Sequence, residues 1–231
     1  MMTALLRKSL AALASLCYPQ NNCCHLCSQP LRTLGEQWLC EPCQKALDEA
    51  ALDPGEQPFF LHELIPCSYA GFAHEGAAKE LAQALKYNGD RFCALPLAQG
   101  MATVFALDCA GSLRKSDFFL PIPLHPSRER MRGFNQAETL CQSLSFHTGL
   151  PVIPTALRRV RATRPQVGLD SAQRRNNLHG AFEVADIQAV YGKRIALVDD
   201  VCTTGSTAVA CAQVLKAFGA KEVCLLTACK A

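Results

Sequence analysis

The stretch RIALVDDVCTTGST, residues 194–207, is the most informative part of the sequence. Its first five residues predict a buried strand, and two carboxylates, Asp199 and Asp200, follow directly. A helical pattern then covers 206–218, and a second apolar strand is expected over 222–228. Apolar strands that alternate with a helix are typical of a parallel sheet covered by helices on both faces. We therefore expect an α/β protein.

The turn that follows the two carboxylates predicts a phosphate site. Gly205 allows close approach to the backbone, and the N-terminus of the next helix presents N–H groups to an anion. Four hydroxyl side chains add donors: Thr203, Thr204, Ser206 and Thr207. Two carboxylates beside a phosphate require a hydroxyl-rich or cationic group between them, and a ribose 5-phosphate meets that requirement. An ordinary strand end with a helix cap is the alternative, and a pair of adjacent aspartates makes it less favourable.

Four cysteines near the N-terminus form two C-x-x-C pairs with twelve residues between them. This spacing is typical of a zinc ribbon, in which four thiolates complete a tetrahedron around Zn²⁺ and leave no open position. The predicted ligands of this structural ion are Cys24, Cys27, Cys40 and Cys43. Cys23 is an alternative to Cys24, and a redox C-x-x-C is the alternative for a single pair.

The remaining cysteines of the 14 stand mostly alone in apolar segments, where a free thiol behaves as a small hydrophobic group. We therefore expect a reduced, cytoplasmic protein. No apolar run reaches the roughly 18 residues of a membrane span. The net charge of +3 is too small to indicate a nucleic-acid binder, and an apolar content of 49% excludes wholesale disorder.

The chain divides into four predicted segments. Residues 1–20 are expected to form an amphipathic helix; a signal peptide is the alternative, but no cleavage site accompanies it. The zinc-ribbon module covers 21–47, and the acidic segment 48–58 with its Pro-Gly pair is predicted to be a linker. The main domain then covers 59–231.

The segment around Asp199 resembles the signature of type I phosphoribosyltransferases, which bind 5-phosphoribosyl 1-diphosphate (PRPP). Nearly the whole chain resembles one branch of these proteins, the ComF-type family linked to DNA uptake and utilisation in bacteria. Besides the paired cysteines, the motifs that carry the resemblance are ALKYNG at 84–89, PIPLHP at 121–126, RGFNQA at 132–137, RATRPQVGL at 161–169 and RRNN at 174–177.

This resemblance implies a type I phosphoribosyltransferase fold with a small N-terminal zinc ribbon, and PRPP bound together with Mg²⁺. Asp199 and Asp200 would be catalytic and hold the ribose diol. Lys86 would reach the diphosphate, although a solvated lysine at a helix end is an equally good interpretation. The implied substrate-binding residues are Lys86, Arg128, Arg132, Arg161, Gln166, Arg174, Val201, Cys202, Thr203, Thr204, Gly205, Ser206 and Thr207.

The arginine-rich segment 157–180 has three interpretations: a lid over the diphosphate, a nucleic-acid surface, or a solvated basic loop. The adjacent phosphate site favours the lid. The expected function is phosphoribosyl transfer, either in the utilisation of nucleotides or DNA or in competence. The alternatives are a non-catalytic accessory factor that binds PRPP or a nucleotide, and a protein of DNA uptake that contacts single-stranded DNA or uptake proteins.

Overall fold

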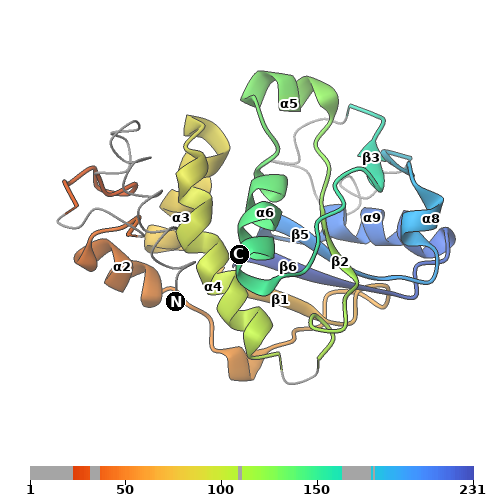
Figure 1. Ribbon diagram of the computed structural model, residues 1–231, viewed down its shortest axis with the longest axis horizontal. Coiled ribbons are helices and arrows are strands. Elements are labelled where there is room, and N and C mark those ends of the chain that lie inside the picture. Colours follow the sequence, from red (N-terminus) through yellow and green to blue (C-terminus); the bar gives the residue numbers. More distant parts are fainter. Residues whose placement is uncertain (1–22, 32–36, 109–110, 163–177, 179) are drawn as a thin grey trace, which may run out of the picture.

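The computed structural model describes residues 23–31, 37–108, 111–162, 178 and 180–231. Four parallel strands form the central sheet in the order β1-β6-β5-β2 (Figure 1). These strands are β1 (Ser68–Ala73), β2 (Phe118–Pro121), β5 (Arg194–Cys202) and β6 (Glu222–Lys230). The helix expected over 1–20 lies outside the described residues.

Helices cover the sheet on both faces (Figure 1). One face packs against α2 (Glu41–Asp48), α3 (Gly76–Gln83), α4 (Ala94–Ala106) and α6 (Gln136–Thr148). The other face packs against α8 (Ile187–Val190), α9 (Ser206–Ala217) and the antiparallel pair β3 (Leu157–Arg159) and β4 (Phe182–Val184). The α/β architecture expected from the sequence, a parallel sheet between two helical layers, is therefore confirmed.

Alternating side chains of β5 explain why both faces of the sheet are covered by apolar side chains. Ala196 and Val198 belong to the core on one side of the sheet, and Ile195 and Leu197 belong to the core on the other. Because successive residues of a strand point to opposite faces, a strand buried on both sides must be apolar at every position. This is why the stretch 195–198 carries no polar residue.

The remaining elements are short and lie in the connections. They are α5 (Pro126–Arg132), the single turns η2 (Pro54–Glu56) and η4 (Arg91–Cys93), and the π-helical turn η3 (Ala84–Asn88). Helix α3 runs directly into the wider turn η3, so the helical segment 76–88 consists of two pieces. In the part of the chain that is described, no helix combines the length and the apolar character that a bilayer crossing requires.

The strand that precedes the phosphate turn is longer than expected. It continues beyond Val198 to Cys202, so that both aspartates lie within β5. The register pairs Asp199 with Thr227 and Cys202 with Lys230 on the neighbouring β6. The acid pair is therefore held by backbone pairing on a rigid element, and its position does not depend on a loop.

Helix α4 crosses β1 at two glycines, which allow the two backbones to lie close together. A Cβ on Gly71 would lie 3.2 Å from the backbone nitrogen of Met101, and a Cβ on Gly100 would overlap the buried ring of Phe72. This contact joins the edge strand β1 to the helical layer, so its packing contributes to the stability of the whole fold.

We expect Gly100→Ala to lower the stability by about 1–3 kcal/mol, because the added methyl group must displace the Phe72 ring. Chemical denaturation of the two proteins measures this difference. The exposed neighbour Gln99 provides the control, since Gln99→Ala on the same helix should change stability by less than about 0.5 kcal/mol. A Gly100→Ala protein as stable as the parent would contradict the close packing.

Candidate functional site

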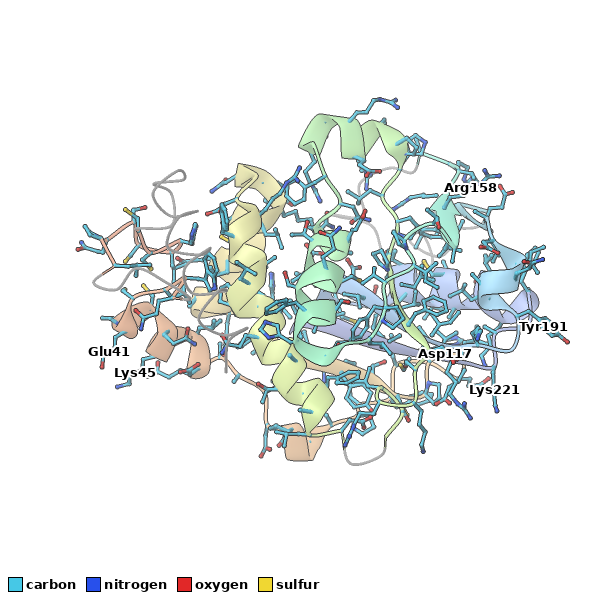
Figure 2. The ribbon with its side chains drawn as sticks, viewed as in Figure 1. Glu41, Lys45, Asp117, Arg158, Tyr191 and Lys221 are labelled. Carbon is cyan, nitrogen blue, oxygen red and sulfur yellow. The ribbon has the colours of Figure 1, made fainter. Side chains whose placement is uncertain are left out.

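A cavity of about 490 Å³ opens at the carboxyl ends of the strands. In open α/β sheets, ligands bind at this edge, where the loops after the strands converge. Three parts of the chain form most of the wall: the end of β5 with the turn into α9, the segment α3–η3, and helix α5 with the residues before it. Figure 2 shows the side chains over these elements.

The two aspartates of β5 form the acidic part of the wall. Asp200 is only 2% exposed, and its Oδ2 lies 3.4 Å from the Nζ of Lys86 on η3. The backbone N–H of Asp200 donates to Oδ1 of Asp199 at 2.9 Å. Among the described residues none donates a hydrogen bond to Asp200 Oδ2. A buried carboxylate oxygen at a cavity wall with no hydrogen-bond donor is suited to accept one from a ligand hydroxyl.

The surroundings of Asp199 and Lys86 shift the pKa values of both groups. Burial and the neighbouring charge of Asp200 raise the pKa of the Asp199 carboxyl well above its usual value, although Lys86 acts against this. Burial of the Lys86 ammonium tends to lower its pKa, but the charges of Asp200 and Asp199 outweigh this effect and raise it. The site therefore holds its lysine charged and makes ionisation of Asp199 beside Asp200 unfavourable.

The turn after β5 presents backbone N–H groups to the cavity. Gly205 begins α9 with a left-handed φ of 66°, and a Cβ there would lie 2.5 Å from the side chain of Leu61. Within the described part of the chain no side chain caps this helix, so the N–H groups of its first turn are available to an anion. The hydroxyls of Thr204 and Ser206 lie 2.8 Å apart beside them. These features make an anion cradle next to the acid pair.

Helix α5 brings cationic side chains to the same cavity. It begins at Pro126, and its N-cap residue His125 accepts from the Ser127 N–H. Arg128 and Arg132 line the cavity, and the Arg132 guanidinium donates to Gln136 on α6. The cavity thus joins an acid pair, an anion cradle and guanidinium groups in one space.

The structure brings most of the predicted site residues together. Arg161 is exposed and does not line the cavity, and Gln166 and Arg174 lie outside the described residues. The predicted residues that do line it are Lys86, Arg128, Arg132, Asp199, Asp200, Val201, Cys202, Thr203, Thr204, Gly205, Ser206 and Thr207.

Several lining residues were not among the predicted ones. Arg159 of β3 is buried, and its guanidinium lies 5.2 Å from the centre of the Phe182 ring. Burial, followed by the charge of Arg128, lowers its pKa. His74, Tyr87 and Gln136 also line the cavity. For Arg159 the sequence offers no signal, because it is one arginine in a run of several and only the pairing of β3 with β4 turns it inward.

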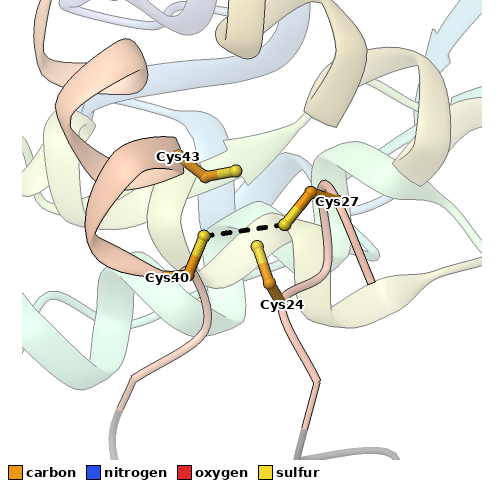
Figure 3. Close-up of side chains that lie close together, drawn as sticks. All are labelled: Cys24, Cys27, Cys40 and Cys43. Atoms are coloured by element: carbon orange, nitrogen blue, oxygen red, sulfur yellow. Dashed lines mark hydrogen bonds between the residues drawn. The ribbon is translucent and has the colours of Figure 1, made fainter. Parts of the chain in front are cut away.

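The four predicted metal ligands lie together near the N-terminus (Figure 3). The sulfur atoms of Cys24, Cys27, Cys40 and Cys43 all lie within 4.8 Å of one another, and those of Cys27 and Cys40 are 3.6 Å apart. Ligands at 2.3 Å around a tetrahedral Zn²⁺ would be roughly 3.8 Å apart. The cluster therefore fits a metal ion of this kind.

The structure distinguishes between the two adjacent cysteines. Cys24 points into the cluster and is buried, whereas Cys23 is exposed and its backbone forms a bridge to Pro30. Burial tends to raise the pKa of the Cys24 thiol, but the backbone N–H groups of Cys27, Cys40 and Leu26 outweigh it and lower the pKa to about 6. Cys24 is therefore the residue prepared to act as a thiolate.

The cysteine module, the described residues of 23–47, packs on the single turn η4. The ring of His25 stacks on Phe92 of η4 with the ring centres 5.2 Å apart, and Trp38 stacks on the same ring at 5.7 Å. The Nδ1 of His25 lies 2.8 Å from Oδ2 of Asp90. These contacts attach the cysteine module to η4, which follows η3 and its Lys86 in the chain.

Comparison with known proteins places the chain among bacterial relatives, although no family model matches it. DNA utilization protein YhgH of Escherichia coli K12 is 30% identical over 227 residues, which cover 90% of this chain and 96% of that protein. Competence protein F of Haemophilus influenzae is 38% identical over 112 residues, which cover 48% of this chain and about half, 49%, of that protein. Competence protein ComFC of Streptococcus pneumoniae is 27% identical over 87% of this chain and 84% of its own.

Among solved structures, glutamine PRPP amidotransferase from B. subtilis in complex with ADP and GMP covers 59% of this chain and 26% of its own. The TM-score of 0.39, at 19% identity, is too low to carry an argument about fold or function. The match to YhgH over nearly the full length of both chains decides the relationship. The chain belongs to the ComF-type family, together with DNA utilization protein YhgH and the competence proteins F and ComFC.

Proposed function

We propose that this protein binds PRPP with Mg²⁺ at the carboxyl edge of its sheet and transfers the phosphoribosyl group to a nitrogen nucleophile. The observation that carries the proposal is the order of charges along one stretch of chain. Asp199 and Asp200 lie at the end of a strand, an uncapped helix N-terminus follows within seven residues, and both line one cavity. A ribose 5-phosphate has hydroxyls and a phosphate in the same order.

Each part of the cavity has a partner on this substrate. The buried oxygen of Asp200 and the carboxylate of Asp199 accept from the 2- and 3-hydroxyls of the ribose. The N–H groups of the turn around Gly205 bind the 5-phosphate. Lys86, Arg128 and Arg132 neutralise the diphosphate, which is itself held by Mg²⁺. Mg²⁺ would be coordinated mainly by the substrate's own oxygens.

The reaction needs charge neutralisation more than it needs a protein nucleophile. Diphosphate leaves C1 with the bonding electron pair, the nitrogen supplies the pair for the new bond, and the nitrogen then releases its proton. Cationic side chains that line the cavity favour the leaving group where its charge develops. The acid pair positions the sugar, so that its C1 is held in a fixed orientation toward the incoming nitrogen.

A second candidate is a protein that binds PRPP without transferring it. The names of two relatives, DNA utilization protein and competence protein, favour this alternative, because they refer to the handling of DNA and to no transfer reaction. In either case we place the PRPP site in the setting of DNA utilisation or competence. Release of diphosphate in the presence of nucleobases separates the enzyme from the accessory factor.

A calorimetric titration with PRPP and Mg²⁺ tests the site. We expect the double variant Asp199→Asn, Asp200→Asn to bind at least roughly a hundredfold more weakly, because it loses two charged hydrogen-bond acceptors. Asp186→Asn provides the control, since Asp186 caps α8 away from the cavity and asparagine caps equally well. A folded wild-type protein that binds no PRPP would contradict the proposal.

The raised pKa of Asp199 also predicts that replacing this residue with asparagine stabilises the protein, and that the gain in stability depends on pH. Between the unfolded carboxyl's value of 3.8 and the raised folded one, the native state binds more protons than the unfolded state, so stability falls as pH rises. Asp199→Asn removes this loss. We expect its melting temperature to exceed that of the wild type at pH 7.5 and the difference to shrink at pH 4.5. A difference independent of pH would contradict the coupling in the pair.

We propose in addition that the four-cysteine cluster holds a structural Zn²⁺. Cys24→Ser should lower the zinc content of the purified protein from about one equivalent towards zero and reduce its melting temperature, because binding and local folding are coupled. The adjacent Cys23→Ser is the matched control and should keep its zinc. Zinc retained in the first variant and lost in the second would reverse the ligand assignment.

A further inference from the structure

We propose that Phe92 couples the four-cysteine cluster to the PRPP site, so that a metal ion in the cluster strengthens PRPP binding and PRPP strengthens retention of the metal. Phe92 is a positioning residue in this proposal, because it does not line the cavity and acts through elements that do. The inference rests on the proposed PRPP site and on the proposed structural Zn²⁺. It adds a coupling between them that neither of those proposals requires.

The ring of Phe92 contacts both halves of the cysteine module, residues 23–31 and 37–47, each of which carries one C-x-x-C pair. His25 of the first half stacks on this ring with 5.2 Å between the ring centres, and Trp38 of the second half stacks on it at 5.7 Å. The backbone N–H of His25 also donates to the carbonyl oxygen of Trp38 at 3.1 Å. Because metal binding draws the two cysteine pairs together, this stack depends on it.

Further contacts hold His25 against η4. Its Nδ1 lies 2.8 Å from Oδ2 of Asp90, and its carbonyl oxygen lies 3.9 Å from the Sγ of the buried Cys93. The other oxygen of Asp90, Oδ1, accepts from the Phe92 N–H at 3.0 Å and caps η4. The Asp90 carboxylate thus binds the cysteine module with one oxygen and η4 with the other.

The turn η4 is connected in turn to two cationic parts of the cavity wall. It follows η3, whose Lys86 has its Nζ 3.4 Å from Oδ2 of Asp200. Arg91 of η4 donates from Nη2 to the carbonyl oxygen of Gly133 at 2.9 Å, and Gly133 ends α5 with its cavity-lining arginines. The guanidinium of Arg91 also lies 4.6 Å from the centre of the Phe134 ring. A shift of η4 therefore disturbs cations on both elements.

The coupling follows from the cost of ordering these cations. When the two cysteine pairs are not held together, Phe92 loses stacking partners and η4 loses its support from the cysteine module. PRPP then binds to a site whose cations must first be ordered, and its affinity falls by the cost of doing so. Coupling between two binding sites is reciprocal, so PRPP raises the affinity for the metal by the same factor.

Calorimetric titration with PRPP and Mg²⁺ before and after removal of zinc tests the coupling. A chelator selective for Zn²⁺ over Mg²⁺ removes the metal, and circular dichroism monitors the fold. We expect the zinc-replete wild type to bind PRPP between about fivefold and fiftyfold more tightly than the zinc-depleted protein. In Phe92→Ala, which keeps all four cysteines, this ratio should fall towards one. Phe92→Tyr retains the ring and should keep the wild-type ratio.

The rate of zinc release to the chelator is a second readout, and it does not require the metal-free protein to be folded. Saturating PRPP with Mg²⁺ should slow the release of zinc from the wild type and from Phe92→Tyr, because the two sites stabilise each other. It should leave the release from Phe92→Ala unchanged. A residue with a merely structural role would change the rate of release without changing its dependence on PRPP.

Phe146 supplies a matched control, because its ring also contacts a histidine ring but does not line the cavity. It is 73% exposed, and its ring centre lies 5.5 Å from that of His147 on the same helix α6. Phe146→Ala should leave the PRPP affinity and its dependence on zinc unchanged. Equal PRPP affinity with and without zinc, or equal slowing of zinc release in the wild type and Phe92→Ala, would overturn the coupling while leaving the PRPP site intact. A folded, zinc-replete wild type that binds no PRPP would instead overturn the proposed function, and the coupling with it.

Discussion

Two carboxyl groups held side by side at the end of a buried strand are the constraint on which the rest of the site depends. Pairing of β5 with β6 fixes Asp199 and Asp200 in place, so the chain cannot relieve their repulsion by moving apart. It compensates with Lys86, whose Nζ approaches Asp200 to 3.4 Å. Lys86 belongs to η3, and the cysteine module stacks on η4 directly after it, so this module is attached next to the cation that faces the acid pair.

The features that could be predicted from the sequence share a local cause. Three features can be recognised within a few neighbouring residues: a fully apolar strand, a turn rich in glycine and hydroxyls, and paired cysteines at fixed spacing. The parallel sheet, the cavity around Asp199 and Gly205, and the cluster of Cys24 with its three partners therefore follow from short stretches of sequence. Even the choice between Cys23 and Cys24 depends only on the direction in which one side chain points.

The features that were missed depend on contacts between distant segments. Nothing near Val198 indicates that β5 continues to Cys202, because the extension is stabilised by pairing with β6. Helix α4 is buried on much of its circumference and so shows little of the periodicity that reveals a surface helix. Arg159 enters the cavity because β3 pairs with β4, which places Arg159 opposite Phe182, 23 positions along the chain, whereas Arg161 remains outside.

The strand order also determines when the sheet can form during synthesis. β6 follows β1, β2 and β5 in the chain, yet it lies in the interior of the sheet between β1 and β5. Until β6 is synthesised, β1 lacks the strand with which it pairs, and the two cores lack their shared wall. Folding from the N-terminus can therefore complete the cysteine module and separate helices, but the sheet closes only after β6 has left the ribosome. Ligand binding should begin only then, and shorter nascent chains should expose an apolar edge that chaperones can recognise.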